Sequence, residues 1–528
     1  MADTKAVSSF PAKTFAEDAL SRLADARSQK SDARKDIQEA LFFTRPRLSY
    51  NIDSSNRHTK RRQDEDEDLA TGIGSEVSED FATEVVSAFF PEGTDWVAAT
   101  IDKSSISDDV EESAITDAEK DAKERNDSIF ASIRASNFES ELGTSLDPHA
   151  SVGTIAWWID KPYNTRPTNV QHVPYRELEF NIEADGSVGD RFRVRWVLGS
   201  RLKSVLPDVD IPAEVQTKIK NTRKCWIEVV WAFWRDWSQP EDEVWQHVIL
   251  VDKKAVHEQK LVGEGCLPLI IARFAPDSEF AWGFGPSIKA LQDYRVLDVI
   301  TAATQDRVDI ALAPPIGYPD DGVTDFEGGL EAGKAYPMRP GSGRDIAKLY
   351  FEGDADLGFY TAQDLERRIR RKHFADYPEQ KGDTPPTATQ WIDEMVKSQR
   401  RIGTAGKKFW REGPYEIYRR FEWLLKQDGK IQDVVIGEQT LTLIPNNPAT
   451  QAANNQKLQT GMQVLGIVKA NFPETAAASV DERATIDNIK KLANDEVVVL
   501  RSEAQTQELL GAVLGVAQEA GVVPGAQQ

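Results

Sequence analysis

The sequence predicts an α+β protein, because helical periodicity and strand-like alternation occupy separate stretches of the chain. Apolar residues recur at helical spacing through most of the first 150 residues. Between about 150 and 275, short β-like runs follow one another with turn residues between them. From Pro286 onward, helical spacing returns over long segments. Helix-rich and strand-rich regions that do not interleave are typical of this fold class.

Three helices are expected before residue 150. Segment 14–43 carries apolar residues at a broken three- and four-residue spacing among charged ones. The most regular stripe in the chain recurs every four residues from Leu69 to Phe89 and stops at a proline. A third helix is expected over 117–142. The polar stretch 44–68 between the first two is interpreted as a loop.

The middle of the chain predicts a sheet. In RFRVRWVLG (191–199), large apolar residues alternate with arginines, and a period of two indicates a strand. Further strand-like runs cover 153–160, 225–237 and 243–252. This region also carries several tryptophans, for which packing in the core or in a subunit contact is favoured over a stacking platform for bases. They are Trp226, Trp231, Trp234, Trp237 and Trp245.

Two long helices are expected to flank a small module in the second half. The motif WGFG (282–285) precedes a proline at a first helical position, and the helix that follows over 286–313 would be about 42 Å long. Residues 314–360 are rich in Pro, Gly and Asp, with possible short strands around 334–339 and 346–351. A returning helix is expected over 361–377, where Thr361 and Asp364 form a plausible capping box.

The remaining chain predicts a loop and further helices. Residues 378–390 have the composition of a mobile loop. A long helix is expected to start at Trp391, with an interruption at Gly413-Pro414 and an end before Gly429. From about 481, two helices are expected, the second over 501–519.

Composition limits the classes of function. The 528 residues carry a formal net charge of −22, and an acidic surface repels nucleic acid. No apolar run approaches the length of a membrane-spanning helix, and no secretory signal is visible, so a cytosolic protein is expected. Cys225 and Cys266 are too few for a disulfide framework or a four-sulfur zinc site, and buried thiols are expected.

No motif predicts an enzyme. The segment from Gly328 to Lys334 is one residue short of a phosphate-binding loop, and Ala335 lacks the hydroxyl that would bind magnesium. The six histidines show no zinc-ligand spacing. Carboxylate pairs such as Asp320-Asp321 are interpreted as solvated turns, although a divalent ion is conceivable there. We therefore expect no catalytic residue, metal or cofactor.

Three stretches of the chain have a distinctive local pattern: ALFFTRPRL (40–48), AFFPEGTDWVAATID (88–102) and LPLIIARF…WGFGPSIKALQDYRVLD (267–298). In these stretches and in the order of its elements, the chain resembles the portal, or head-to-tail connector, proteins of short-tailed tailed bacteriophages. The resemblance covers roughly 14–430. It implies a portal-type fold that assembles into a ring of twelve copies.

The resemblance also implies a division of the chain. The parts would be a wing at 1–285 with a β-rich section at 150–275, a descending stem helix at 286–313, a clip at 314–360, an ascending stem helix at 361–377, a channel loop at 378–390, a long wing helix at 391–430, and a wing return with crown helices at 431–528. Lys381, Gly382, Asp383 and Thr384 would line the channel.

The implied role is structural. Double-stranded DNA would pass through the ring at a capsid vertex, and terminase, scaffold, capsid and tail adaptor proteins would dock on it, without any membrane. An acidic wall would keep DNA from adhering. The protein would be made in the host cytoplasm and end in the virion.

Two uses are open for the basic cluster of the ascending helix, which comprises Arg367, Arg368, Arg370, Arg371 and Lys372. Ion pairs with acidic residues of a neighbouring stem are favoured over contact with DNA in the channel. The acidic candidates are Asp293, Asp298, Asp306 and Asp309. Alternative functions are a nucleotide-hydrolysing packaging enzyme that uses Lys334, and a capsid or tail-tube subunit.

Overall fold

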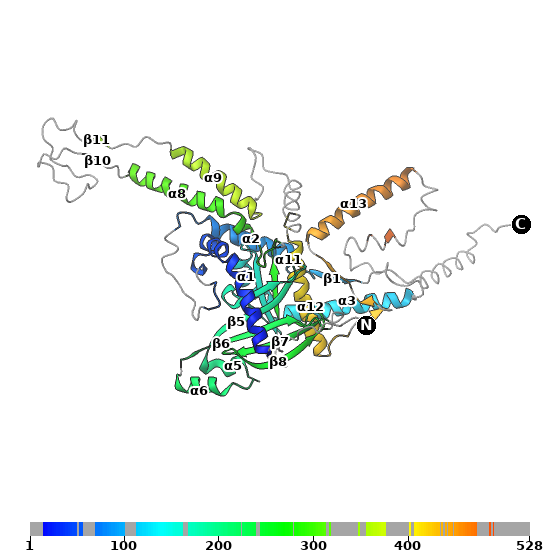
Figure 1. Ribbon diagram of the computed structural model, residues 1–528. Helices are drawn as coiled ribbons and strands as arrows, with labels where there is room; N and C mark the ends of the chain where they lie inside the picture. Colours follow the sequence, from blue (N-terminus) through cyan, green and yellow to red (C-terminus); the bar gives the residue numbers. More distant parts are fainter. Residues whose placement is uncertain are drawn as a thin grey trace, which may run out of the picture.

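The computed structural model describes residues 14–49, 52–55, 69–100, 112–161, 167–207, 209–222, 224–238, 243–277, 279–312, 316–317, 347–348, 355–375, 401–402, 406–432, 435–436, 439–440, 442–446, 448–471, 485–486 and 489. The described chain forms a layered body of sheets and helices from which a pair of helices projects (Figure 1). The α+β class predicted from the sequence is confirmed.

A five-stranded antiparallel sheet lies at the centre of the body. Its strands, in spatial order, are β4 (Leu178–Ile182), β5 (Val188–Leu198), β6 (Trp226–Arg235), β7 (Val244–Val251) and β8 (Lys254–Val262). Each strand pairs with the next one in the sequence, as short turns between antiparallel neighbours permit.

Both faces of the inner strands β5, β6 and β7 are largely buried, which explains why these strands carry so many large apolar residues. Along β6, Trp231 and Phe233 belong to one core cluster, whereas Val230, Ala232 and Trp234 belong to another. This alternation follows from the two-residue period of a strand. The packing role predicted for the tryptophans is confirmed for Trp231, Trp234 and Trp245, which are buried. Trp237 is exposed with the Arg235 guanidinium over its ring, and its packing against another subunit stays a prediction.

Helix α1 (Phe15–Thr44) covers one face of the sheet (Figure 1). Its apolar stripe, Ala19, Leu23 and Ala26, packs on β5, β6 and β7. Lys30 then enters the protein and donates hydrogen bonds to the carbonyls of Tyr175 (2.6 Å) and Leu178 (2.9 Å). Burial lowers the pKa of Lys30, while the adjacent carboxylate of Glu179 opposes that shift. The helix is thereby fixed to the edge strand β4.

A three-stranded antiparallel sheet, in the order β3 (Asn169–His172), β2 (Thr154–Asp160) and β9 (Leu269–Arg273), covers the other face. Leu269 and Ile271 share the core cluster of Phe233. The opposite side of β2 and β9 packs against helices α2 (Ile73–Phe89), α3 (Glu112–Ala135), α4 (Phe138–His149), α11 (Lys407–Glu412) and α12 (Pro414–Gln427).

Smaller elements complete the described chain. They are η1 (Pro46–Leu48), β1 (Val97–Thr100), η3 (Tyr175–Glu177), η4 (Gly199–Arg201), α5 (Leu202–Val205), α6 (Ala213–Asn221), β12 (Val435–Ile436), β13 (Gln439–Thr440), β14 (Thr442–Pro445) and α13 (Pro448–Asn471). Strand β14 pairs with β1, and β12 pairs with β13.

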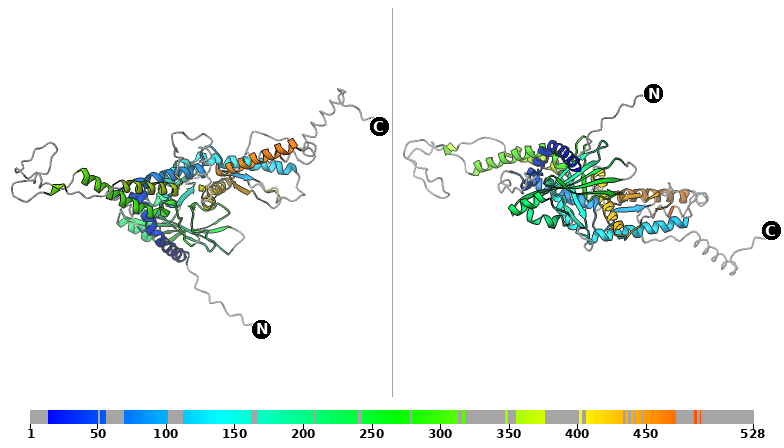
Figure 2. Two further views of the ribbon diagram at one scale, coloured as in Figure 1. Left: turned by 90° about the horizontal axis from the view of Figure 1, so that it is seen from above. Right: turned by 60° about the horizontal axis from the view of Figure 1, so that its bottom comes forward.

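The projecting part consists of α8 (Leu291–Leu312) and α9 (Ala355–Lys372), which lie side by side and are here called the helix pair. Figure 2 shows from two further directions that the pair leads away from the sheets. The short helix α7 (Pro286–Lys289) joins α8 to the body. Beyond the far end of the pair, β10 (Ile316–Gly317) and β11 (Ala347–Lys348) are antiparallel neighbours.

The structure corrects the predicted helix over 117–142, which is two helices. The break lies at Ser136 and Asn137, because the Asn137 side chain is used elsewhere. Its amide donates to the Val170 carbonyl at 2.8 Å and its oxygen accepts from the Val170 N–H at 2.7 Å. An asparagine that mimics a strand neighbour in this way competes with helix continuation.

Two further helix predictions need correction. The helix predicted over 286–313 breaks at Ala290, whose N–H donates to the carbonyls of both Pro286 and Ser287. The returning helix begins at Ala355, so Thr361 lies inside it and does not cap it. Its end comes at Lys372 because Phe374 adopts a left-handed conformation with φ of 59°.

Other predictions are confirmed or fall outside the described residues. The helices predicted at 14–43 and up to Phe89 are confirmed, and Thr14 forms a capping box with Glu17. The interruption at Gly413 separates α11 from α12. The possible strand at 334–339 and the helix at 501–519 lie outside the described residues.

Candidate functional site

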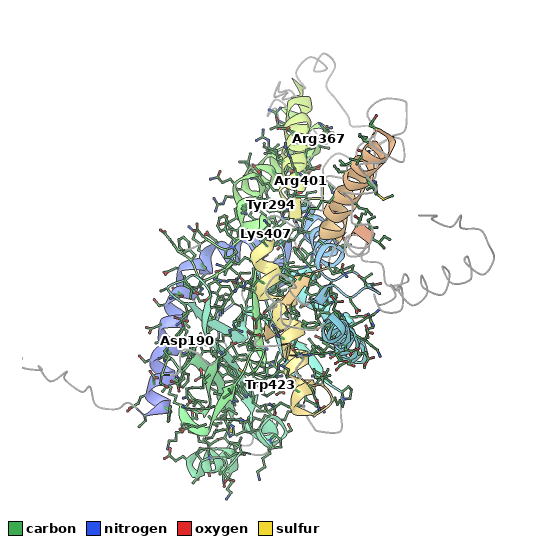
Figure 3. All side chains as sticks on the ribbon, turned by 90° about the vertical axis from the view of Figure 1, so that its right-hand side faces the viewer. Asp190, Tyr294, Arg367, Arg401, Lys407 and Trp423 are labelled. Carbon is green, nitrogen blue, oxygen red and sulfur yellow. The ribbon has the colours of Figure 1, made fainter. Side chains whose placement is uncertain are left out.

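The helix pair and its attachment to the body form the candidate functional site, because the pair projects from the body and carries most of the charged residues that the sequence singled out. The two helices meet through apolar side chains, and Tyr294 and Leu297 of α8 share a core cluster with Leu365 and Ile369 of α9. Figure 3 places Tyr294 near the base of the pair and Arg367 farther along it.

Glycines fix the base of the pair to the body. Gly283 N–H donates to the Thr154 hydroxyl at 2.8 Å, and Gly285 N–H donates to the Val152 carbonyl at 2.9 Å. A Cβ on Gly283 would overlap the carbonyl oxygen of Gly153, which itself adopts φ of 115°. The backbone of the WGFG motif therefore lies directly against the turn before β2, and only glycine permits this approach.

A histidine connects both helices at this base. His373 is completely buried, and its Nε2 lies 2.9 Å from the Ser287 hydroxyl of α7 and 3.3 Å from the Tyr294 hydroxyl of α8. Its Nδ1 lies 2.9 Å from the Ile369 carbonyl, so Nδ1 carries the proton and Nε2 accepts. Burial lowers the pKa of His373 to about 4, against the opposing effect of the Ile369 carbonyl. The imidazole is therefore neutral at pH 7.

We expect His373 to make stability depend on pH. The unfolded imidazole takes up a proton below about pH 6.5, whereas the native one takes it up only near pH 4. The stabilisation from His373 is therefore present above pH 6.5 and is lost as the pH falls to 4, by about 3 kcal/mol. The measurement is the free energy of unfolding by urea at pH 4 to 8, for the wild type and His373→Gln.

Because carboxylates also titrate in this range, the difference between the two proteins is the informative quantity. It should shrink steadily between pH 6.5 and 4. A difference that is constant with pH would contradict the neutral state assigned to His373.

The basic cluster pairs partly within its own chain. Lys372 lies 2.7 Å from Asp293 of α8, and it also donates to the Lys289 carbonyl at 3.0 Å. Arg368 pairs with Asp364 one turn earlier, at 2.7 Å. Asp293 thus has a partner within its own chain, and its pairing with a neighbouring subunit stays a prediction.

Arg370 joins the helix pair to α2, where it lies 2.9 Å from Glu76 and 3.9 Å from Asp80. Asp298 accepts a hydrogen bond from the Ala70 N–H at 2.9 Å. Both contacts attach the helix pair to the segment around the start of α2. Arg370 and Asp298 thus serve the attachment of the helix pair to the body.

The remaining charges of the predicted site face solvent. Arg367 and Arg371 are exposed on α9, and Asp306 and Asp309 are exposed on α8. None of the four takes part in an ion pair within the part of the chain that the structure describes. Lys372 and Arg370, by contrast, form ion pairs with carboxylates of the same chain.

An apolar strip lies on the outer face of α8. Val296 and Val299 are 48% and 68% exposed, and Ala303 one turn later is also exposed. At 100° per residue the three lie within about 60° of one another, on the side away from α9. Valines exposed in line on a projecting helix suggest a surface that another molecule covers.

Parts of the predicted site lie outside the described residues. These are the channel-loop residues Lys381, Gly382, Asp383 and Thr384, the nucleotide-site candidate Lys334, and Asp320 and Asp321 of the predicted clip. Sequence reasoning missed Ser287, Tyr294 and His373, since a lone histidine after a lysine gives no local signal.

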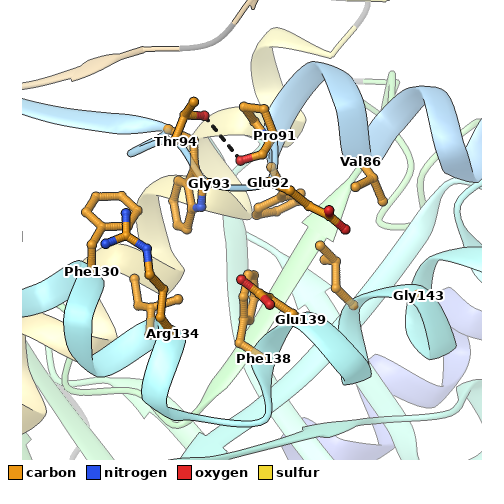
Figure 4. A pocket seen from close by; sticks show the side chains of 14 residues that line it. Val86, Pro91, Glu92, Gly93, Thr94, Phe130, Arg134, Phe138, Glu139 and Gly143 are labelled. Carbon is orange, nitrogen blue, oxygen red and sulfur yellow. Dashed lines mark hydrogen bonds between the residues drawn. The ribbon is translucent and has the colours of Figure 1, made fainter.

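Figure 4 shows a surface pocket of about 190 Å³ between the end of α2, α3 and α4. Phe130 and Phe138 line it, and Arg134 at its edge is already paired with Asp95. The Thr94 hydroxyl in its lining donates a hydrogen bond to the Pro91 carbonyl at 3.2 Å.

No metal-binding group of three or more His, Cys, Asp or Glu occurs among the described residues. Cys266 is buried and Cys225 is half-buried, both as free thiols. Burial raises the pKa of Cys266 to about 12, which makes it a poor nucleophile.

Among the helices that the structure describes, none has the length and apolar character that crossing a membrane requires.

The described part of the chain is a layered α+β body that carries a projecting helix pair, an architecture that suits a structural assembly protein. The family comparison agrees with this class. Residues 16–494 match the family model described as bacteriophage head to tail connecting protein, and the chain belongs to that family. The protein is therefore a structural component of the phage virion at the junction of head and tail. The search of curated proteins found no match.

Proposed function

We propose that twelve copies of this chain form a closed ring at a capsid vertex, with the helix pairs side by side around a channel for double-stranded DNA. Genome packaging and ejection would both use this channel, and terminase, capsid or scaffold and tail adaptor proteins would dock on the ring. The subunit would assemble in the host cytoplasm. The observation that carries the proposal is the exposed apolar strip of α8, Val296, Val299 and Ala303, on a helix that projects from the body.

The geometry favours a head-to-tail contact between copies. The outer face of α8 offers valines with Asp306 and Asp309, and the outer face of α9 offers Arg367 and Arg371. Two different faces that complement each other generate a ring when the rotation closes. In such a ring α8 of one copy would contact α9 of the next, and the division into wing, stem, clip and crown given by the resemblance would apply.

Weak contact with DNA would follow from the overall charge. Each copy carries −22, so the ring is strongly acidic and repels phosphates during transit. Lys381 in the proposed channel loop 378–390 would add one basic ring that positions the duplex. The nucleotide-hydrolysing alternative gains no support from the structural family, and the force for packaging would come from a separate motor.

Val299→Glu is expected to prevent ring assembly. Burial of a valine contributes about 1.5–3 kcal/mol per contact, and the glutamate would also bring an unpaired charge into the interface. The measurement is the mass of the assembly by light scattering and sedimentation at a fixed protein concentration. Val262→Glu, at an exposed valine that ends β8 on the body, is the matched control and should assemble normally. Assembly of Val299→Glu at wild-type concentration would contradict the proposed contact.

A charge-reversal series tests the pairing of the helix faces. Arg367→Glu with Arg371→Glu should weaken assembly, and the further changes Asp306→Arg and Asp309→Arg should restore it, since the opposite charges would again face each other. If the arginines instead face DNA, reversal leaves assembly intact and reduces packaged DNA. The two readouts therefore separate ion pairs between subunits from a role in the channel.

A further inference from the structure

Helix α13 exposes apolar side chains on several sides. Met462, Val464 and Ile467 are 55%, 54% and 60% exposed. At 100° per residue they point in different directions around the last turns of the helix, while Leu458 and Leu465 are half-buried. Large apolar side chains that are exposed together on one helix are normally covered by another surface. Met462, Val464 and Ile467 lack such a cover among the described residues.

We propose that residues 501–519 of the same chain pack on this surface of α13. The sequence of that segment predicts a helix with one apolar stripe, at the spacing i, i+1, i+4, i+5 and i+8. The stripe consists of Leu509, Leu510, Val513, Leu514 and Ala517. Its opposite side carries Glu508, so one face is suited to pack on α13 and the other to face water.

The charges of the two segments are complementary. The only charged residues of α13 are Lys457 and Lys469, and it contains no acidic residue. Segment 501–519 contains Arg501 against three glutamates, Glu503, Glu508 and Glu519. A helix with net positive charge thus faces one with net negative charge, which favours their association over that of two α13 helices.

The length of the connection favours a contact within one chain. Residues 472–500 separate the two segments, and even a wholly helical connection of these 29 residues would be about 44 Å long. Helix α13, with 24 residues, is about 36 Å long. The connection is therefore long enough to bring the segment back to α13, at an effective concentration that a second copy does not match in dilute solution.

Disulfide cross-linking of the full chain tests this inference. In a Cys225→Ala background, which leaves only the buried Cys266, the pair Ile467→Cys with Leu510→Cys is oxidised and run on a non-reducing denaturing gel. The expected product is a monomer of altered mobility that reductant restores. A second pair, Met462→Cys with Leu514→Cys, covers a different register. The matched control is Ile467→Cys with Glu508→Cys, which places the thiol on the opposite side of the same predicted helix and should cross-link far less.

Two outcomes would overturn the inference. A ladder of disulfide-linked multimers would show that a second copy covers α13, and equal or absent cross-linking in all three pairs would show that the segment packs elsewhere. Circular dichroism of each variant identifies any that fails to fold. Because the inference does not require the ring, sedimentation of the same samples distinguishes its failure from failure of the proposed function.

Discussion

Replacing Arg273 with leucine is expected to destabilise the body by about 3–5 kcal/mol, because it breaks a buried ion pair and leaves the partner charge behind. The Arg273 side chain has no exposed surface. Its guanidinium binds both oxygens of Glu412, at 2.5 and 3.0 Å, and donates to the carbonyls of Ala281 and Gly186. It therefore joins β9, α11 and two loops at once.

Urea denaturation of the wild type and Arg273→Leu measures this effect. The matched control is Arg368→Leu, which removes an exposed pair with Asp364 one helical turn away and should leave the midpoint unchanged. If both substitutions have the same small effect, the buried network does not stabilise the protein. The double variant Arg273→Leu with Glu412→Leu should recover part of the loss, since no unpaired charge then remains.

Gly283→Val is expected to cost several kcal/mol and to displace the helix pair from the body. The Cβ of the new valine would overlap the Gly153 carbonyl oxygen. The same oxygen accepts a hydrogen bond from the Phe274 N–H at 2.8 Å, which holds it in place. A backbone obstacle of this kind cannot rotate away as a side chain can. The free energy of unfolding and the protease sensitivity of the segment 283–290 measure the two effects.

The control for this prediction is Gly143→Ala. Gly143 lies inside α4, and nothing lies within 4 Å of the position of an added Cβ. Alanine there should stabilise the protein by about 1 kcal/mol through helix propensity. Opposite signs for the two substitutions would confirm that close packing, rather than glycine as such, matters at the base of the helix pair. Equal effects would refute it.

Local sequence patterns correctly predicted elements that depend on neighbouring residues of the chain, such as strand β5 and the start of helix α7. The alternation in 191–199 predicted a strand because one side of β5 packs on α1 while the other faces the second sheet. The proline after WGFG predicted a helix start, and α7 begins there. The pattern did not reveal that Arg191 and Arg193 of β5 are buried, where they donate to the Leu269 carbonyl and to Glu177.

Prediction failed where a distant residue determines the outcome. The break at Asn137 depends on Val170, and the buried position of His373 depends on Ser287 and Tyr294. The charged cluster was predicted in part. The sequence indicated ion pairs and included Asp293 among the candidate partners, and Lys372 contacts Asp293 within its own chain. Spacing along the chain could not show whether such a contact forms within one chain or between two.

The pairing of strands β10 and β11 matters for protein engineering, because it holds two distant points of the chain next to each other. The chain departs at Gly317 and returns at Ala347, which pair with each other beyond the far end of the helix pair. Whatever sequence joins these two neighbouring points need not disturb the folded part behind them. A fluorescent reporter or a receptor-binding domain with adjacent termini is a suitable replacement for 318–346, and exchange of tips between related phages is open to evolution by the same route.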